Sequence, residues 1–184
     1  MFINEKDENN LVWYAAYGSN MLWERFRHYL EGGSFRGQGA NHSPCINPTL
    51  PQEKRTILLP YPMYFANHSG SWEGKGVSFL DVHTPGESMG VCYLITQQQL
   101  DHIYKAENGG FIPSLHSTWY NLLHPLGDLD GHPVYTITNR STLTPNAPGE
   151  RYLKVLTEGL SENYPHLAEE EIRLYLKKCQ EYNG

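Results

Sequence analysis

The sequence predicts a single α+β domain. Strand-like runs dominate the middle of the chain, helical patterns lie toward its ends, and no regular alternation of strand and helix indicates a doubly wound parallel sheet. A chain of 184 residues can bury about 70% of its unfolded surface, which is enough for one core. We expect an N-terminal tail over residues 1–10 and one domain over residues 11–184.

The first predicted elements are a buried strand and a helix joined by a polar turn. Leu11 to Ala16 is apolar enough for a buried strand, and Gly18-Ser19-Asn20 ends it with residues suited to tight turns. Apolar residues then recur with helical spacing from Met21 until Gly32-Gly33 stops the pattern. Asn20 is the expected N-cap of this helix.

Residues 31–55 are rich in glycine and proline and have no sustained period, so we expect a long loop there. Five further strands are expected, at Thr56–Ala66, 77–81, Met89–Ile95, Ser117–Leu123 and Val134–Thr138. Three helices are expected at Thr96–Ala106, Arg151–Leu160 and Ala168–Glu181. The first of these opens with a capping box, in which Thr96 is followed three residues later by Gln99.

Composition excludes several functional classes. The net charge is −6 and no basic cluster exceeds Lys177-Lys178, so a nucleic-acid partner is not expected. No apolar run approaches the roughly 20 residues that cross a bilayer, and the N-terminus lacks a signal-peptide pattern, so we expect a soluble cytoplasmic protein without a membrane partner. Cys45, Cys92 and Cys179 have no C-x-x-C spacing, which argues against a disulfide framework or a zinc site.

Glu107 is the most informative local anomaly. It follows the helix of residues 96–106, and Asn108-Gly109-Gly110 end that helix with residues suited to a left-handed exit. A carboxylate there faces the negative end of the helix dipole, where stability alone favours Lys or Arg by roughly 0.3–1 kcal/mol. Glu107 is therefore either an exposed glutamate that lowers the stability of the helix only slightly or a residue that acts as a general acid or base.

The Gly18-Ser19-Asn20 turn also has two interpretations. A strand that ends in such a tripeptide before a helix leaves backbone N–H groups available to an anion, but the same residues also form ordinary turns and caps. Ser19 does not lie in a G-x-S-x-G elbow, which argues against a serine hydrolase. The histidines are scattered, without H-E-x-x-H or Cys/His spacing, so no metal site is predicted.

Several fragments together resemble the γ-glutamylcyclotransferase-like family. "YAAYGSNM" at residues 14–21 resembles the family's Y-x-x-Y-G-S-N-L signature, with Met21 in place of leucine. "MGVCYLIT", "LDHIYKAENGG", "YTITN" and "PGERYLKVLTEG" resemble the later family segments in the correct order. The resemblance covers roughly residues 11–182 and is weakest over residues 31–73. The loop that contains "PYPMYFANHSGSWEG", at residues 60–74, differs from the short connection of the family, and we expect it to close over the leaving-group side.

The resemblance implies a mixed, barrel-like sheet with flanking helices and a reaction that needs no metal or cofactor. In that reaction a γ-glutamyl group cyclises to 5-oxoproline and releases an amine. Glu107 would be the catalytic acid–base residue. The implied substrate-binding residues are Tyr14, Ala15, Ala16, Tyr17, Gly18, Ser19, Asn20, Tyr135 and Tyr152. For Tyr135 and Tyr152, plain core packing is an equal alternative.

The sequence is also compatible with two other functions. The same fold can serve as a non-catalytic module that binds a small ligand, because fold does not determine function. A metal-dependent amidohydrolase that uses some of the nine histidines is the third candidate. The expected partner is a small γ-glutamyl molecule, and a monomer and a homodimer are both compatible with the sequence.

Overall fold

A computed structural model describes residues 9–183, so most of the expected N-terminal tail lies outside the described residues. The strands are β1 (Leu11–Ala16), β2 (Glu53–Leu59), β3 (Met63–Ser69), β4 (Lys75–Leu80), β5 (Ser88–Thr96), β6 (Leu122–Leu129) and β7 (His132–Thr138). The α-helices are α1 (Trp23–Glu31), α2 (Gln97–Ala106), α3 (Glu150–Asn163) and α4 (Glu169–Glu181). Short 3-10 turns lie at Ser19–Met21 (η1), Phe35–Gly37 (η2) and Gly70–Trp72 (η3).

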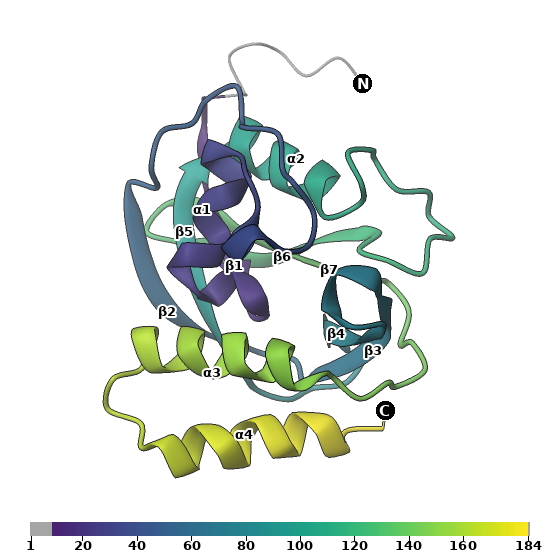
Figure 1. Cartoon of the computed structure of the whole chain (residues 1–184). Helices are drawn as coiled ribbons and strands as arrows, with labels where there is room; N and C mark the ends of the chain where they lie inside the picture. The colour runs from purple at the N-terminus through teal and green to yellow at the C-terminus, as the bar shows by residue number, and fades with distance from the viewer. Residues whose placement is uncertain (1–8, 184) are drawn as a thin grey trace.

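A mixed five-stranded sheet with the order β2-β5-β1-β7-β6 forms the centre of the molecule (Figure 1). β1 pairs antiparallel with β5 and parallel with β7, which confirms the predicted α+β class and the buried first strand. β3 and β4 form a separate two-stranded sheet. The Thr138 hydroxyl joins this hairpin to β7, because it bonds both the N–H and the carbonyl of Leu80.

Two of the strand predictions were wrong in their extent. The run Thr56–Ala66 is two strands, because Pro60 and Pro62 cannot donate to a ladder and the chain turns between β2 and β3. The run predicted at Ser117–Leu123 becomes a strand only at Leu122. Its earlier part is a loop whose carbonyl groups are bonded by the Asn121 and Asn139 side chains rather than by a neighbouring strand.

The N-cap assignment of Asn20 was also wrong. Helix α1 begins at Trp23 with Leu22 at its N-cap position, and Asn20 lies one turn earlier, in η1. Its side chain is buried and bonds other side chains instead of the helix N-terminus. The predicted capping box of α2 is confirmed, since Thr96 and Gln99 bond each other's backbone N–H groups.

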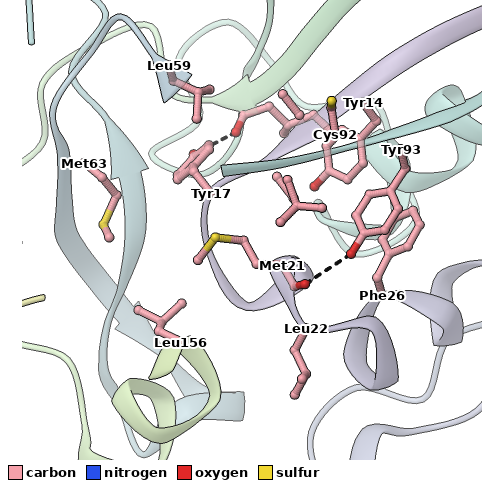
Figure 2. Close-up of a cluster of buried hydrophobic side chains, with 14 of the residues drawn as sticks. Tyr14, Tyr17, Met21, Leu22, Phe26, Leu59, Met63, Cys92, Tyr93 and Leu156 are labelled. Atoms are coloured by element: carbon pink, nitrogen blue, oxygen red, sulfur yellow. Dashed lines mark hydrogen bonds between the residues drawn. The ribbon is translucent and has the colours of Figure 1, made fainter. Parts of the chain in front are cut away.

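Aromatic side chains in the core hold η1 and α1 against the sheet. The Phe26 ring of α1 stacks on Tyr93 of β5, with ring centroids 4.0 Å apart. The Tyr93 hydroxyl donates to the backbone carbonyls of Asn20 and Met21, and the second of these bonds is drawn in Figure 2. The buried Tyr93 side chain therefore holds the polar turn that follows β1 in place.

Helices α3 and α4 lie side by side along one side of the molecule (Figure 1). Helix α3 approaches η1 closely at Gly159, where an added Cβ would lie 2.9 Å from the Leu22 nitrogen. No helix between residues 9 and 183 is long and apolar enough to cross a membrane.

Candidate active site

A cavity of about 690 Å³ opens where the C-terminal end of β1 meets η1, α1 and the end of α2. The structure brings most of the expected site residues to it. Those that line its wall are Tyr14, Tyr17, Gly18, Ser19, Asn20, Glu107 and Tyr152. Segments separated by almost ninety residues along the chain thus meet at one hollow of the size used for small molecules.

Glu107 is placed at this cavity by the end of helix α2. It is the C-cap residue, and its backbone N–H still bonds the Ile103 carbonyl at 2.9 Å. Gly109 and Gly110 follow with φ of 71° and 94°, as the predicted left-handed exit requires. The chain leaves the helix there, and the half-buried Glu107 side chain lines the cavity.

Two side chains hold one oxygen of the Glu107 carboxylate. The amide of Asn20 and the hydroxyl of Tyr29 each donate to Oε1 at 2.8 Å. Hydrogen bonds to a carboxylate are stronger than neutral ones, so these two contacts orient the group firmly. The hydrogen bonds found between described residues leave Oε2 without a side-chain donor.

Asn20 connects the turn to the acid. The same Nδ2 group that donates to Glu107 also donates to the Tyr14 hydroxyl at 3.1 Å. Its Oδ1 atom is buried and has no hydrogen-bond partner within residues 9–183. Asn20 therefore contributes to the site through its Nδ2 group, which links the Tyr14 hydroxyl to the Glu107 carboxylate.

Helix α1 supplies a second wall that sequence analysis missed. Tyr29 accepts a hydrogen bond from Arg25 Nη2 at 3.1 Å while it donates to Glu107. Arg25 Nη1 lies 3.3 Å from His42 Nε2, and the His42 ring packs against the Tyr29 ring with centroids 4.3 Å apart. Burial and the Arg25 charge lower the pKa of His42 to about 4, so at neutral pH its ring can accept from Arg25.

Tyr152 supports the opposite wall. Its hydroxyl donates to Ser78 Oγ and accepts from the Ser78 N–H, each at 3.1 Å. Gly18 lies against this pair, because an added Cβ would be 3.0 Å from the Tyr152 oxygen. A side chain at position 18 would therefore push the turn away from Tyr152.

Three expected site residues do not line the cavity. Ala15 and Ala16 are fully buried within β1, and Ala15 pairs with Cys92 on one side and Thr136 on the other. Tyr135 is half-buried in β7 and packs against the hydrophobic core. Tyr120 lines the cavity instead, with its ring stacked on Phe79 at 4.7 Å and its hydroxyl bonded to the Ser78 carbonyl.

The described residues contain no group of three or more His, Cys, Asp or Glu side chains that could hold a metal ion. All three cysteines are buried and unpaired.

Comparisons with known proteins identify the fold. No family model matches the chain. Histone deacetylase 5 of Arabidopsis thaliana is 24% identical over 202 residues, a stretch that covers 91% of this chain. The chain spans only 30% of the length of that relative.

The solved structures give a more direct match. An uncharacterized protein from Homo sapiens superimposes with a TM-score of 0.62 at 20% identity, over 95% of this chain and 92% of the other. A gamma-glutamyl cyclotransferase gives 0.59 at 18% identity, over 95% and 92% of the two chains. YkqA from Bacillus subtilis gives 0.52 at 17% identity, over 94% and 56%. The chain has the γ-glutamyl cyclotransferase-like fold, as the resemblance implied.

Proposed function

We propose that the chain is a γ-glutamyl cyclotransferase, which releases 5-oxoproline and an amine or amino acid from a γ-glutamyl substrate. The observation that carries this proposal is the Glu107 carboxylate. It is oriented through Oε1 by Asn20 and Tyr29, in a cavity that the β1–η1 turn also lines. The fold shared with a gamma-glutamyl cyclotransferase is consistent with this chemistry.

Glu107 acts as the general base and then as the general acid. Its Oε2 atom takes a proton from the α-ammonium of the substrate, and the resulting amine attacks the γ-carbonyl carbon to close a five-membered ring. The bond from that carbon to the leaving nitrogen then breaks as the leaving nitrogen receives this proton from Glu107. Glu107 next takes the second proton of the ring nitrogen, which becomes the lactam N–H, and passes it to the released amine, which departs as an ammonium. The products are 5-oxoproline and the free amine, so neither water nor an oxidant is consumed.

Positioning is the second contribution. Because the attacking and attacked atoms belong to one molecule, the enzyme chiefly has to fold the substrate into a near-attack geometry and stabilise the charge that develops. The backbone of the η1 turn is suited to bind the substrate carboxylate or the developing oxyanion, because the first N–H groups of a helical turn have no partner within it. Ser19 is not a nucleophile in this mechanism.

A non-catalytic module that binds a small ligand is the competing function. A binder would use Glu107 only as an ion-pair partner for the α-ammonium of its ligand and would release no 5-oxoproline. Glu107 lines the cavity and is held by two side-chain donors, which favours catalysis.

The test is release of 5-oxoproline from a panel of γ-glutamyl dipeptides and amides, measured by chromatography. Glu107→Gln keeps the shape and a carbonyl acceptor for Asn20 and Tyr29 but cannot take the proton, so we expect turnover to be lost. Glu181→Gln, an exposed change on α4, is the matched control. Turnover of no substrate, or equal activity of Glu107→Gln and the parent, would falsify the proposed mechanism.

A further inference from the structure

The segment that follows Glu107 is a loop over residues 108–121, which we call the rim loop. It joins α2 to β6 and contains no Asp, Glu, Lys or Arg residue. Three of its side chains are large, apolar and mostly exposed, since Phe111 is 76% exposed, Ile112 71% and Leu115 61%. Apolar side chains that gather on one exposed segment often mark a site that binds a ligand or a partner.

The rim loop borders the cavity that holds Glu107. Gly109, Pro113 and Ser117 of this loop all line the cavity. Each of the three exposed apolar residues lies within two residues of one of these, so its Cα atom is at most about 7.6 Å from that of a lining residue. The exposed apolar side chains therefore belong to the rim of the cavity.

The apolar surface continues from the rim into the cavity. Trp119 and Tyr120, near the end of the rim loop, line the cavity, and Trp119 is half-buried. Trp72 of η3 lines it as well. The arginine of the lining, Arg25, belongs to α1 and donates to the Tyr29 hydroxyl. The rim-loop side of the cavity is therefore suited to an uncharged, apolar group.

Side-chain amides hold the rim loop at both ends. The Asn108 side chain donates to the Tyr120 carbonyl at 3.0 Å and so ties the first residue of the loop to one of the last. The Asn121 side chain donates to the carbonyls of Leu115 and Ser117, at 3.0 Å and 2.8 Å. A loop that is already fixed in this way loses less conformational entropy when it binds a ligand.

The place of the rim loop in the chain relates it to the leaving group. In the proposed reaction Glu107 delivers a proton to the leaving nitrogen, and the rim loop begins at the next residue. The cavity of about 690 Å³ is in the range that drug-sized ligands occupy, so it has room for more than a γ-glutamyl group. The substituent on the leaving nitrogen is thus expected beside this loop.

We infer that the rim loop binds the amine part of the substrate through apolar contacts. This inference rests on the proposed function and assigns the substrate class, namely γ-glutamyl conjugates whose amine part has an alkyl or aromatic body. The γ-glutamyl group occupies the inner part of the cavity, beside Glu107, and the amine part extends past Trp119 toward Phe111 and Ile112. No bond is made or broken at the rim loop.

A matched pair of substrates isolates the apolar contact. γ-Glutamyl-hexylamide and γ-glutamyl-ethylamide have the same scissile bond and differ by four methylene groups. Burial of one methylene group corresponds to a factor of about four in an equilibrium or rate constant. We expect kcat/KM for 5-oxoproline release to be about fifteenfold higher for the hexylamide, which is the effect of burying two of the four.

Exposed variants of the rim loop test the assignment without disturbing the core. The double variant that combines Phe111→Ser and Ile112→Ser lowers the ratio of the two kcat/KM values at least threefold. Leu174→Ser is the matched control, because Leu174 is an exposed apolar residue of α4, 51% exposed, that does not line the cavity, and it leaves the ratio unchanged. A ratio near one in the parent, or a ratio that the double variant does not lower, overturns the rim-loop assignment. Release of 5-oxoproline from either amide leaves the proposed function standing in that case.

Sedimentation velocity tests the other occupant of an exposed apolar surface, which is a second copy of this chain. We expect the parent and the double variant to sediment alike. A parent that self-associates and a double variant that does not, with the same substrate ratio in both, would identify the rim loop as a contact between copies and overturn its assignment to the substrate.

Calorimetric binding to Glu107→Gln separates the two proposals if neither amide is turned over. Tighter binding of the hexylamide than of the ethylamide, weakened when Phe111→Ser and Ile112→Ser are added, supports the apolar rim while the proposed reaction fails. Equal binding of the two amides, or binding of neither, rejects the rim-loop assignment as well.

Discussion

Asn20→Asp is the most direct test of the candidate active site. It replaces the amide donor of Asn20 with a charged oxygen and preserves the shape of the side chain. The substitution removes the donor that lies 2.8 Å from Glu107 Oε1 and replaces it with an oxygen. Loss of one hydrogen bond to a charged group costs about 1.5–3 kcal/mol, which corresponds to roughly 10- to 150-fold in rate if it is lost in the transition state. Repulsion between two carboxylates in the partly buried site adds to this.

We therefore expect kcat/KM for 5-oxoproline release to fall on the order of a hundredfold in Asn20→Asp. Asn163→Asp is the matched control, because Asn163 donates to the Met21 carbonyl of the same turn, at 2.9 Å, but does not contact Glu107. Thermal unfolding of both variants separates loss of fold from loss of rate. An Asn20→Asp protein that folds and retains the parent kcat/KM contradicts the assignment of Asn20 as the residue that orients Glu107.

Three further outcomes test the packing and electrostatics. Thr96→Ala removes the capping box of α2 and should lower the free energy of unfolding by about 1 kcal/mol in urea titrations, with kcat unchanged. Gly159→Ala places a Cβ 2.9 Å from the Leu22 nitrogen, so unfolding measurements should show a loss of about 1–3 kcal/mol despite the better helix propensity of alanine. The folded structure lowers the pKa of His42 from 6.5 to about 4. Between these two pH values the unfolded chain binds a proton that the folded chain does not, so the free energy of unfolding falls as the pH drops from 6.5 to 4. His42→Gln should show a smaller decrease between pH 7 and pH 5, and equal decreases in both proteins would refute the buried neutral imidazole.

Local patterns in the sequence predicted the elements that position the site. The apolar run before Gly18, the capping box at Thr96 and the glycines after Glu107 each act through nearest neighbours in the chain, so their consequences can be read from short windows. The errors arose where tertiary contacts override such patterns. Asn20 suits an N-cap, but the approach of α2 from far along the chain gives its amide a carboxylate to bind instead.

The second wall could not be predicted from hydrophobic periodicity because that criterion treats Tyr29 only as a core residue. Its ring does lie in the core, but its hydroxyl reaches Glu107, which follows it by 78 residues. The available signal was the spacing of Arg25 and Tyr29, which places both side chains on one face of α1 next to the polar turn. For Tyr135 the sequence left core packing and substrate contact as equal alternatives, because a matching segment does not show which tyrosine faces a cavity. In the structure Tyr120 lines the cavity and Tyr135 does not.

The order of groups along the α1 wall explains how a cation can lie near the proposed general base, Glu107, without disabling it. An arginine bonded directly to Glu107 would hold the carboxylate in an ion pair and oppose its uptake of a proton. Here Tyr29 stands between them, accepting from Arg25 and donating to Oε1, so the guanidinium orients the acid through a neutral hydroxyl. Burial raises the pKa of Tyr29, which keeps that hydroxyl protonated as a donor throughout the working range. Because Asn20 and Tyr29 both bond Oε1, the proton transfers of the proposed reaction are left to Oε2.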